Sequence, residues 1–201
     1  LVKPVLMAIV EKHYGVKIPE GQVQPFFEGN LAGSSFMFRG GRITAGQTET
    51  ATDAVEAVWP VLDAAMVAAR EDPDPTTVLG RYYSGGVPDP TFSEAKMRSA
   101  LMTMIGGYLP TCTNASGRVM DVLLDRKDAM SYLRDAVAAK NDGALLAGIQ
   151  EALRLNYIIP MLQRRAAHDT YIGGGTTKQR AIREGTRVVV SLQAGMSDRR
   201  R

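Results

Sequence analysis

The stretch from Glu151 to Asp198 constrains the fold more than any other part of the chain. It opens on a helical pattern in which Glu151 and Arg154, three residues apart, share one helix face and can form an ion pair. After Pro160 the basic pair Arg164–Arg165 follows on an extended segment, and a glycine-rich turn then leads into a β-branched strand. The Glu-x-x-Arg spacing alone is not specific, because residues 184–187 also match it. The order of the features carries the information.

Composition indicates an ordinary globular protein with one or two domains. The chain has 201 residues, of which 45% are hydrophobic and 22% charged. The net charge of +3 equals the contribution of the terminal run 199–201, and only 6% of the residues are aromatic. We therefore expect no nucleic-acid partner, because a protein surface that binds nucleic acid combines clustered basic residues with aromatic side chains.

Cysteine and histidine usage excludes several kinds of site. Cys112 is the only cysteine, which rules out an internal disulfide and a multi-cysteine zinc site and suits a reducing, cytoplasmic compartment. His13 and His168 stand alone, so we expect no metal site built from this chain's residues. No apolar run is long enough to cross a membrane, and the first residues do not have the pattern of a signal peptide. Since the chain begins with Leu1 and stops in a basic stretch, we expect an internal fragment.

Apolar periodicity predicts a mainly α chain with strands only near its C-terminal end. Thr91 and Glu94 are spaced as a capping box, and residues 26–46 are glycine-rich and expected to be irregular. We expect a single domain over residues 1–201. The predicted helices are 1–16, 52–70, 77–83, 91–126, 127–140 and 144–156, and the predicted strands are 170–172 and 187–192.

The ordered features after Glu151 resemble the E-x-x-R helix and the following sheet of the cytochrome P450 superfamily of haem-thiolate enzymes. The resemblance implies a P450-like helical fold with a small β-sheet near the C-terminal end. It also implies that Glu151 and Arg154 form a buried structural ion pair that braces a haem-binding core; the alternative is a surface pair. Arg164 stands where the family has an arginine that reaches a haem propionate. Arg165 competes for this role, although strand alternation lets only one of them face the haem, and both can instead be a solvated basic pair.

Residues 104–114 are similar to the central helix of that family, which crosses the haem face. Gly106 and Gly107 match the small pair of its A-G-x-D/E-T-T pattern, where a flat ligand comes close to the backbone. Leu109 and Pro110 fall where the family has the acid and the alcohol that deliver protons during oxygen activation, and neither can do so. Pro110 also removes a backbone donor and tends to kink a helix.

The same segment offers polar groups of its own. Thr111 follows the alcohol position, and Asn114 lies three residues further on, near enough to share its helix face. We assign Thr111 and Asn114 as candidate catalytic contacts. A plainer interpretation is that the glycines and proline only bend a packing helix.

The resemblance implies a haem b oxidoreductase acting on a small apolar or lipid-like substrate. The axial cysteine is not found in this chain, because nothing after Asp198 supplies it and Cys112 lacks the glycine-rich surroundings. Residues 1–90 would cover the substrate, 91–126 would form the central helix, 127–156 the helices ending in E-x-x-R, and 157–201 the sheet region. The oxidant would be dioxygen, with electrons from a ferredoxin or reductase, or a peroxide or hydroperoxide, as in a peroxygenase. The alternative is a non-catalytic helical ligand-binding domain, such as the effector domain of a transcriptional regulator.

Overall fold

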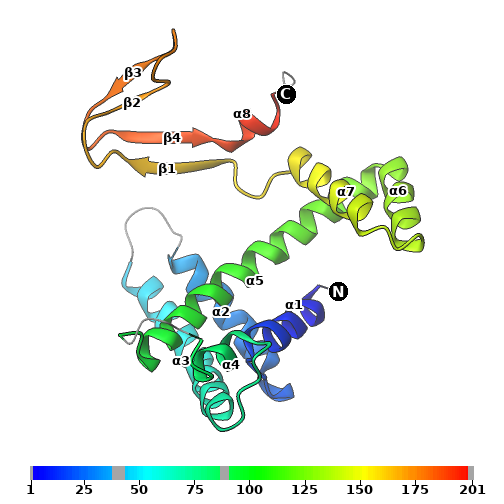
Figure 1. The fold of residues 1–201 in the computed structure, drawn as a ribbon, viewed down its shortest axis with the longest axis vertical. Helices are drawn as coiled ribbons and strands as arrows, with labels where there is room; N and C mark the ends of the chain where they lie inside the picture. Colours follow the sequence, from blue (N-terminus) through cyan, green and yellow to red (C-terminus); the bar gives the residue numbers. More distant parts are fainter. Residues whose placement is uncertain (1, 38–43, 87–90, 199–201) are drawn as a thin grey trace. The chain divides into compact units, whose positions relative to one another are not determined.

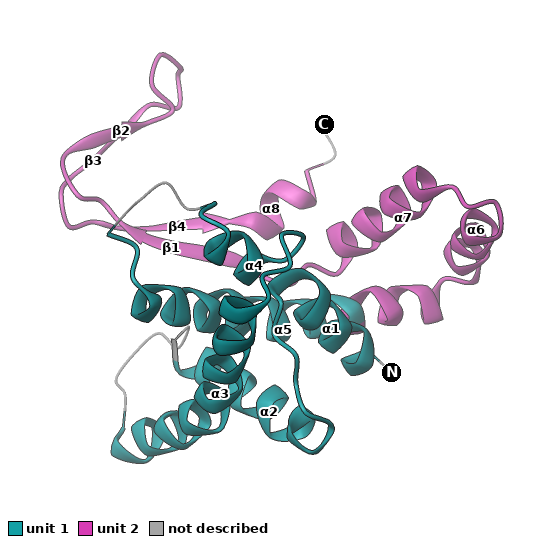
Figure 2. Cartoon of the chain, turned by 60° about the horizontal axis from the view of Figure 1, so that its bottom comes forward, with its two compact units in different colours: residues 1–116 teal, residues 117–201 magenta. Residues whose placement is uncertain are grey.

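The computed structural model describes residues 2–37, 44–86 and 91–198, and the chain divides into two compact units. Unit 1 comprises Leu1–Ser116 and unit 2 comprises Gly117–Arg201, coloured separately in Figure 2. The boundary falls within one long helix, α5 (Glu94–Asp125). The predicted mainly α fold with a late β region is confirmed (Figure 1). The single domain stays a prediction.

Unit 1 is entirely helical over the residues that the structure describes. Its elements in chain order are α1 (Lys3–Ile9), the π-helical turn η1 (Val10–Tyr14), the 3-10 turn η2 (Glu20–Gln22), α2 (Val23–Met37), α3 (Ala45–Glu71), α4 (Val78–Tyr83) and the first two thirds of α5.

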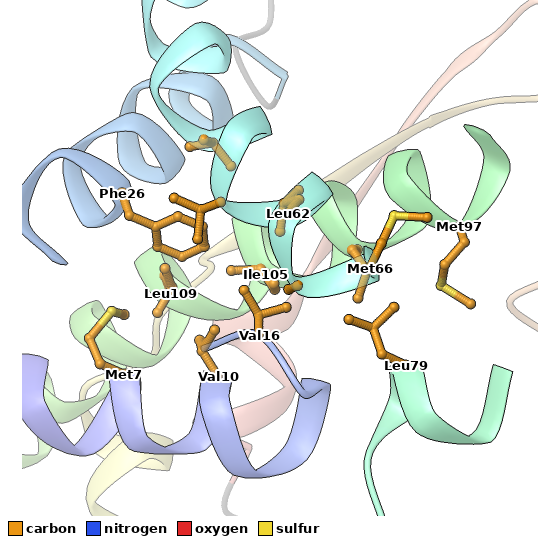
Figure 3. Packing of buried hydrophobic residues seen from close by; sticks show 14 of the residues in the cluster. Met7, Val10, Val16, Phe26, Leu62, Met66, Leu79, Met97, Ile105 and Leu109 are labelled. Carbon is orange, nitrogen blue, oxygen red and sulfur yellow. The ribbon is translucent and has the colours of Figure 1, made fainter. Parts of the chain in front are cut away.

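A single hydrophobic cluster holds unit 1 together. On α5, Leu101, Ile105 and Leu109 recur every four residues and are fully buried. Aliphatic, methionine and phenylalanine side chains from the other helices pack around this row, among them Phe26 of α2 and Leu62 of α3 (Figure 3). Burying a side chain of this size stabilises the fold by about 1.5–3 kcal/mol, so this row contributes a large part of the stability of unit 1.

The prediction that residues 26–46 are irregular is wrong for the helical part of that range. Residues 26–37 belong to α2, and residues 38–43 lie outside the described residues. Gly29 of α2 serves close packing rather than a turn. A Cβ on Gly29 would lie 2.7 Å from the carbonyl oxygen of Ala54 and 2.9 Å from a methyl group of Val58. Tertiary contact with α3 therefore overrides the poor helix propensity of glycine.

Two helix starts differ from prediction because of their caps. α3 begins at Ala45, seven residues earlier than expected, because Thr44 and Gln47 form a reciprocal capping box. The capping box predicted for Thr91 and Glu94 is wrong, since Glu94 is itself the first residue of α5. Ser93 accepts a hydrogen bond from the Lys96 N–H at 3.4 Å instead. The Glu94 carboxylate binds the guanidinium of Arg70 at 2.7 Å.

Unit 2 joins two helices to a pair of small antiparallel sheets. Its elements after α5 are α6 (Lys127–Ala138), α7 (Asp142–Leu155), β1 (Met161–Arg165), β2 (Thr170–Ile172), β3 (Arg180–Ile182), β4 (Arg187–Ser191) and α8 (Leu192–Met196). β1 pairs with β4, and β2 pairs with β3 (Figure 1). The strand predicted at 170–172 is confirmed, and the strand predicted at 187–192 is confirmed up to Ser191, since Leu192 begins α8. The sequence analysis does not predict β3 or α8.

No helix among the described residues is both long and apolar enough to cross a membrane.

The glycines of α2 generate a stability prediction. We expect Gly29→Ala to lower the free energy of unfolding by about 1–3 kcal/mol, because its Cβ meets the α3 backbone, which cannot yield without moving the helix. Gly33→Ala is the matched control, since its Cβ would approach only the terminal methyl of Met102, at 3.8 Å. The control should be neutral or raise stability by up to about 1 kcal/mol through helix propensity. Urea unfolding followed by circular dichroism measures both, and equal destabilisation would contradict this packing.

Candidate functional site

One exposed face of α5 carries three of the predicted site residues. Gly107, Thr111 and Asn114 are spaced by four and three residues and therefore share a face, on which Thr111 and Asn114 are exposed. A Cβ added to Gly107 would meet nothing within 4 Å. Gly106, by contrast, is buried. The two glycines predicted to act together thus have different surroundings, and only Gly107 leaves open backbone on the exposed face.

The position of Leu109 explains why no acid stands there. Its side chain is fully buried in the hydrophobic cluster of unit 1 (Figure 3). A carboxylate at this point would be buried among aliphatic groups without a partner, which costs several kcal/mol. The interior of unit 1 therefore requires an apolar residue at 109.

Pro110 lies inside α5 without ending it. Because proline has no N–H, the Gly106 carbonyl cannot receive the usual helical bond from residue 110. One turn later the Thr113 hydroxyl donates to the Leu109 carbonyl at 2.7 Å. Such a bond from a threonine to the carbonyl four residues earlier often accompanies a bend in a helix.

Cys112 does not have the environment of a metal-bound thiolate. It packs against the hydrophobic cluster beside Tyr108, and burial raises the pKa of its thiol above the ordinary value. The protonated form therefore dominates near neutral pH, whereas a metal ligand is the thiolate. The Tyr108 hydroxyl oxygen is also buried, and no described residue hydrogen-bonds it. Among the described residues, no group of three or more His, Cys, Asp or Glu side chains could hold a metal ion.

Glu151 and Arg154 form the expected ion pair near the end of α7, where both side chains are partly exposed. Two guanidinium nitrogens of Arg154 each donate to a different carboxylate oxygen of Glu151 at 2.7 Å. Within this chain the side chains of Glu151 and Arg154 are 57% and 44% exposed, and burial of the pair in the whole protein stays a prediction. On α7, Gly148 lies against Leu133 and Tyr132 of α6, and Ala152 is buried, whereas Glu151 and Arg154 are not.

The pair nevertheless has a structural consequence within unit 2. A third donor of Arg154 reaches the Met196 carbonyl at 2.8 Å, which connects α7 to the last turn of α8. The hydrogen bonds from Arg154 lower the pKa of the Glu151 carboxyl below its ordinary value. The carboxylate thus keeps its charge over a wider acidic range, and the guanidinium is held by three acceptors.

The strand register gives Arg164 and Arg165 different surroundings. Arg164 lies opposite Val188 and Arg165 lies opposite Arg187, and residues directly opposite in an antiparallel pair share a face. The Arg164 face is otherwise aliphatic, with Leu162 two residues away. Both arginines are exposed, and the hydrogen bonds found for their guanidinium groups go to main-chain carbonyls, of Gln163 at 2.8 Å and Gly185 at 2.6 Å. Their remaining donors can bind an anion.

Asn156 is a structural residue that sequence analysis missed. It follows the last residue of α7, and its side chain accepts from Arg118 at 2.8 Å and donates to the Asp121 carboxylate at 3.1 Å. It therefore fixes the end of α7 to the last turns of α5. An asparagine directly after a helical pattern is a helix-end signal, so the position could have been noticed.

Comparison with known proteins identifies the fold. No protein-family model and no curated protein sequence matches the chain. Three solved structures match it closely in shape. They are CalO2 (TM-score 0.76, 19% identity, 100% of this chain and 47% of that one), P450BioI in complex with hexadec-9Z-enoic acid ligated acyl carrier protein (0.73, 20%, 98% and 47%) and epothilone B-bound cytochrome P450epoK (0.70, 18%, 96% and 45%).

The chain spans about half the length of these structures. It therefore has part of the cytochrome P450 fold, as the ordered features after Glu151 predict.

Proposed function

We propose that the whole protein containing this chain is a haem-thiolate oxidoreductase that oxidises a small apolar or lipid-like molecule. The observation that carries the proposal is the P450-type fold over the entire chain. The ordered features of the second half of the chain also support the proposal. They include the bidentate Glu151–Arg154 pair and Arg164 on the aliphatic face of β1. When bound, haem supplies the redox chemistry, and the protein supplies binding, orientation and electrostatics.

Residues of each unit fit a haem group in part. In unit 1, the open backbone at Gly107 suits close approach of a flat ring, and Thr111 and Asn114 on the same face are the proposed polar contacts near the reacting groups. In unit 2, Arg164 can donate two hydrogen bonds to a propionate and keeps its charge at every relevant pH. Cys112 does not fit the axial position, so the proposal assigns the thiolate ligand to a part of the whole protein outside this chain.

Apolar substrates are the proposed class because comparable proteins bind them. The solved relatives carry a fatty acyl group on a carrier protein in one case and epothilone B in another. In this chain, residues 1–90 are proposed to cover such a substrate. We further propose a cytoplasmic location.

The side chains of α5 favour a peroxide or hydroperoxide as the oxidant. Dioxygen activation requires proton delivery, and the buried Leu109 and the cyclic Pro110 have no proton to give. A peroxide already brings its protons and electrons, so positioning by Thr111 and Asn114 would suffice. A ferredoxin or a reductase is the proposed electron donor if dioxygen is used.

The carbon monoxide difference spectrum of the whole protein tests the haem-thiolate proposal directly. We expect the reduced protein to give the carbonyl band of thiolate-ligated haem. Cys112→Ser is the control and should keep this band, because Cys112 is partly buried against the hydrophobic cluster of unit 1. Loss of the band in the control would make Cys112 the ligand. Absence of the band in the unmodified protein would contradict the proposed function.

The two adjacent arginines provide a second test. In the whole protein, Arg164→Ala should accelerate haem loss by about tenfold to a hundredfold, which corresponds to one or two lost charge-assisted hydrogen bonds. Arg165→Ala is the matched control, since it removes the same charge from the opposite face of β1. Transfer of haem to apomyoglobin gives the rates. Equal acceleration in both variants would remove the assignment of Arg164.

The oxidant can be tested at Pro110. The whole protein should oxidise its substrate with hydrogen peroxide or an organic hydroperoxide and turn over poorly with dioxygen and a reductase. Pro110→Thr restores a hydroxyl and should raise the ratio of oxygen-supported to peroxide-supported turnover at least about tenfold, since side-chain proton delivery contributes about 10²–10⁴-fold. Leu109→Asp is unsuitable because it would bury a charge. Efficient coupling to dioxygen in the unmodified protein, without peroxide activity, would contradict the proposal.

A further inference from the structure

The segment that forms the two sheets carries positive charge that its own residues do not neutralise. Its only acidic residues between positions 161 and 191 are Asp169 and Glu184. No ion pair among the described residues includes a base of this segment. These bases are Arg164, Arg165, Lys178, Arg180, Arg183 and Arg187.

The charge is concentrated where two arginines face each other across β1 and β4. Arg165 and Arg187 are directly opposite in the register, so their side chains lie on the same face of the sheet, and both are exposed. Like charges in this position destabilise a sheet. Arg165 donates to the Gly185 carbonyl, which satisfies one of its five donors. An arrangement that is unfavourable in the isolated sheet becomes favourable when anions bind both guanidinium groups.

The residues around Arg165 and Arg187 indicate which kind of anion binds to these two arginines. On the same face Met161 and Val189 are 50% and 52% exposed, and Gln163 lies between Met161 and Arg165. Arginine and methionine beside exposed aliphatic groups are typical of protein–protein interfaces, whereas a small-molecule site is enclosed. A nucleic-acid surface would be expected to have aromatic rings among its bases. None of the residues opposite or between these positions is aromatic.

We propose that this face of the β1–β4 sheet, formed by Met161, Gln163, Arg165, Arg187 and Val189 and called here the Arg165 face, docks a protein partner whose contact surface carries carboxylates. Each guanidinium group can bind one carboxylate through two parallel hydrogen bonds, and the exposed aliphatic side chains supply apolar contact. The attraction is electrostatic and therefore weakens with ionic strength. The proposal is independent of the haem function, because Arg164 points to the other face.

Binding of poly-L-glutamate to the full chain tests the proposal, with fluorescence anisotropy as the readout at low and high salt. We expect binding at low salt that is lost at about 0.5 M salt, where the screening length is only about 4 Å. The double variant Arg165→Gln/Arg187→Gln should weaken binding at least about tenfold. The double variant Arg180→Gln/Arg183→Gln is the matched control, because it removes the same amount of charge at β3, where Arg180 lies in the strand and Arg183 directly follows it. This control should weaken binding less than about twofold. Circular dichroism checks that both variants keep their fold.

Other outcomes overturn the proposal in distinguishable ways. Equal weakening by the two double variants would mean that only net charge matters. Stronger binding to phosphatidylserine vesicles than to poly-L-glutamate, dependent on Arg165 and Arg187, would identify a lipid surface. Stronger binding to a short DNA duplex would identify a nucleic acid. No binding of poly-L-glutamate at low salt would exclude a carboxylate-binding face.

Discussion

Burial of one row of aliphatic side chains on α5 is the constraint on which unit 1 depends. Leu101, Ile105 and Leu109 form this row, and side chains from α1 to α4 pack around it. Because a helix turns only one face to the core, residues on its opposite face turn away from the core. Thr111 and Asn114 are exposed for this reason, and Gly107 has open space beside its backbone. Packing on one side of α5 thus defines the candidate site on the other side.

The same constraint gives physical meaning to the departure from the A-G-x-D/E-T-T pattern. In the sequence, Leu109 and Pro110 are simply the residues found where the pattern has an acid and an alcohol. In the structure, Leu109 belongs to the core, so its replacement by an acid would cost stability in addition to changing chemistry. Replacement of Pro110 does not carry this cost in stability, so Pro110 can be exchanged independently of Leu109. The two positions have comparable roles in the motif but different surroundings in the folded chain. Only position 110 can therefore take a proton donor without a loss of stability.

Much of the fold could be predicted from sequence because it is recorded in periodicity and in ordered motifs. The long α5, the helices before Glu151 and the strands at 170–172 and 187–192 all follow these signals. The failures have a common cause, which is dependence on tertiary contacts. α2 is a helix despite its glycines because Gly29 packs on the α3 backbone. How far Glu151 and Arg154 are exposed within this chain likewise depends on how α7 packs, which residue spacing does not reveal.

The β1–β4 register determines what the two neighbouring arginines can do. Since side chains alternate along a strand, a slip by one residue would exchange Arg164 and Arg165 between the aliphatic and the charged face. The register is fixed where the strands end. Ala166 donates to the Thr186 carbonyl at 3.0 Å, and Gly185 donates back to Ala166 at 2.9 Å. Gly185 has a φ of 77°, a left-handed conformation that favours glycine. Gly185 has no functional group, but the turn that it forms keeps Arg164 on one face of the sheet and Arg165 on the other. A larger residue at position 185 would disturb the roles of both arginines together.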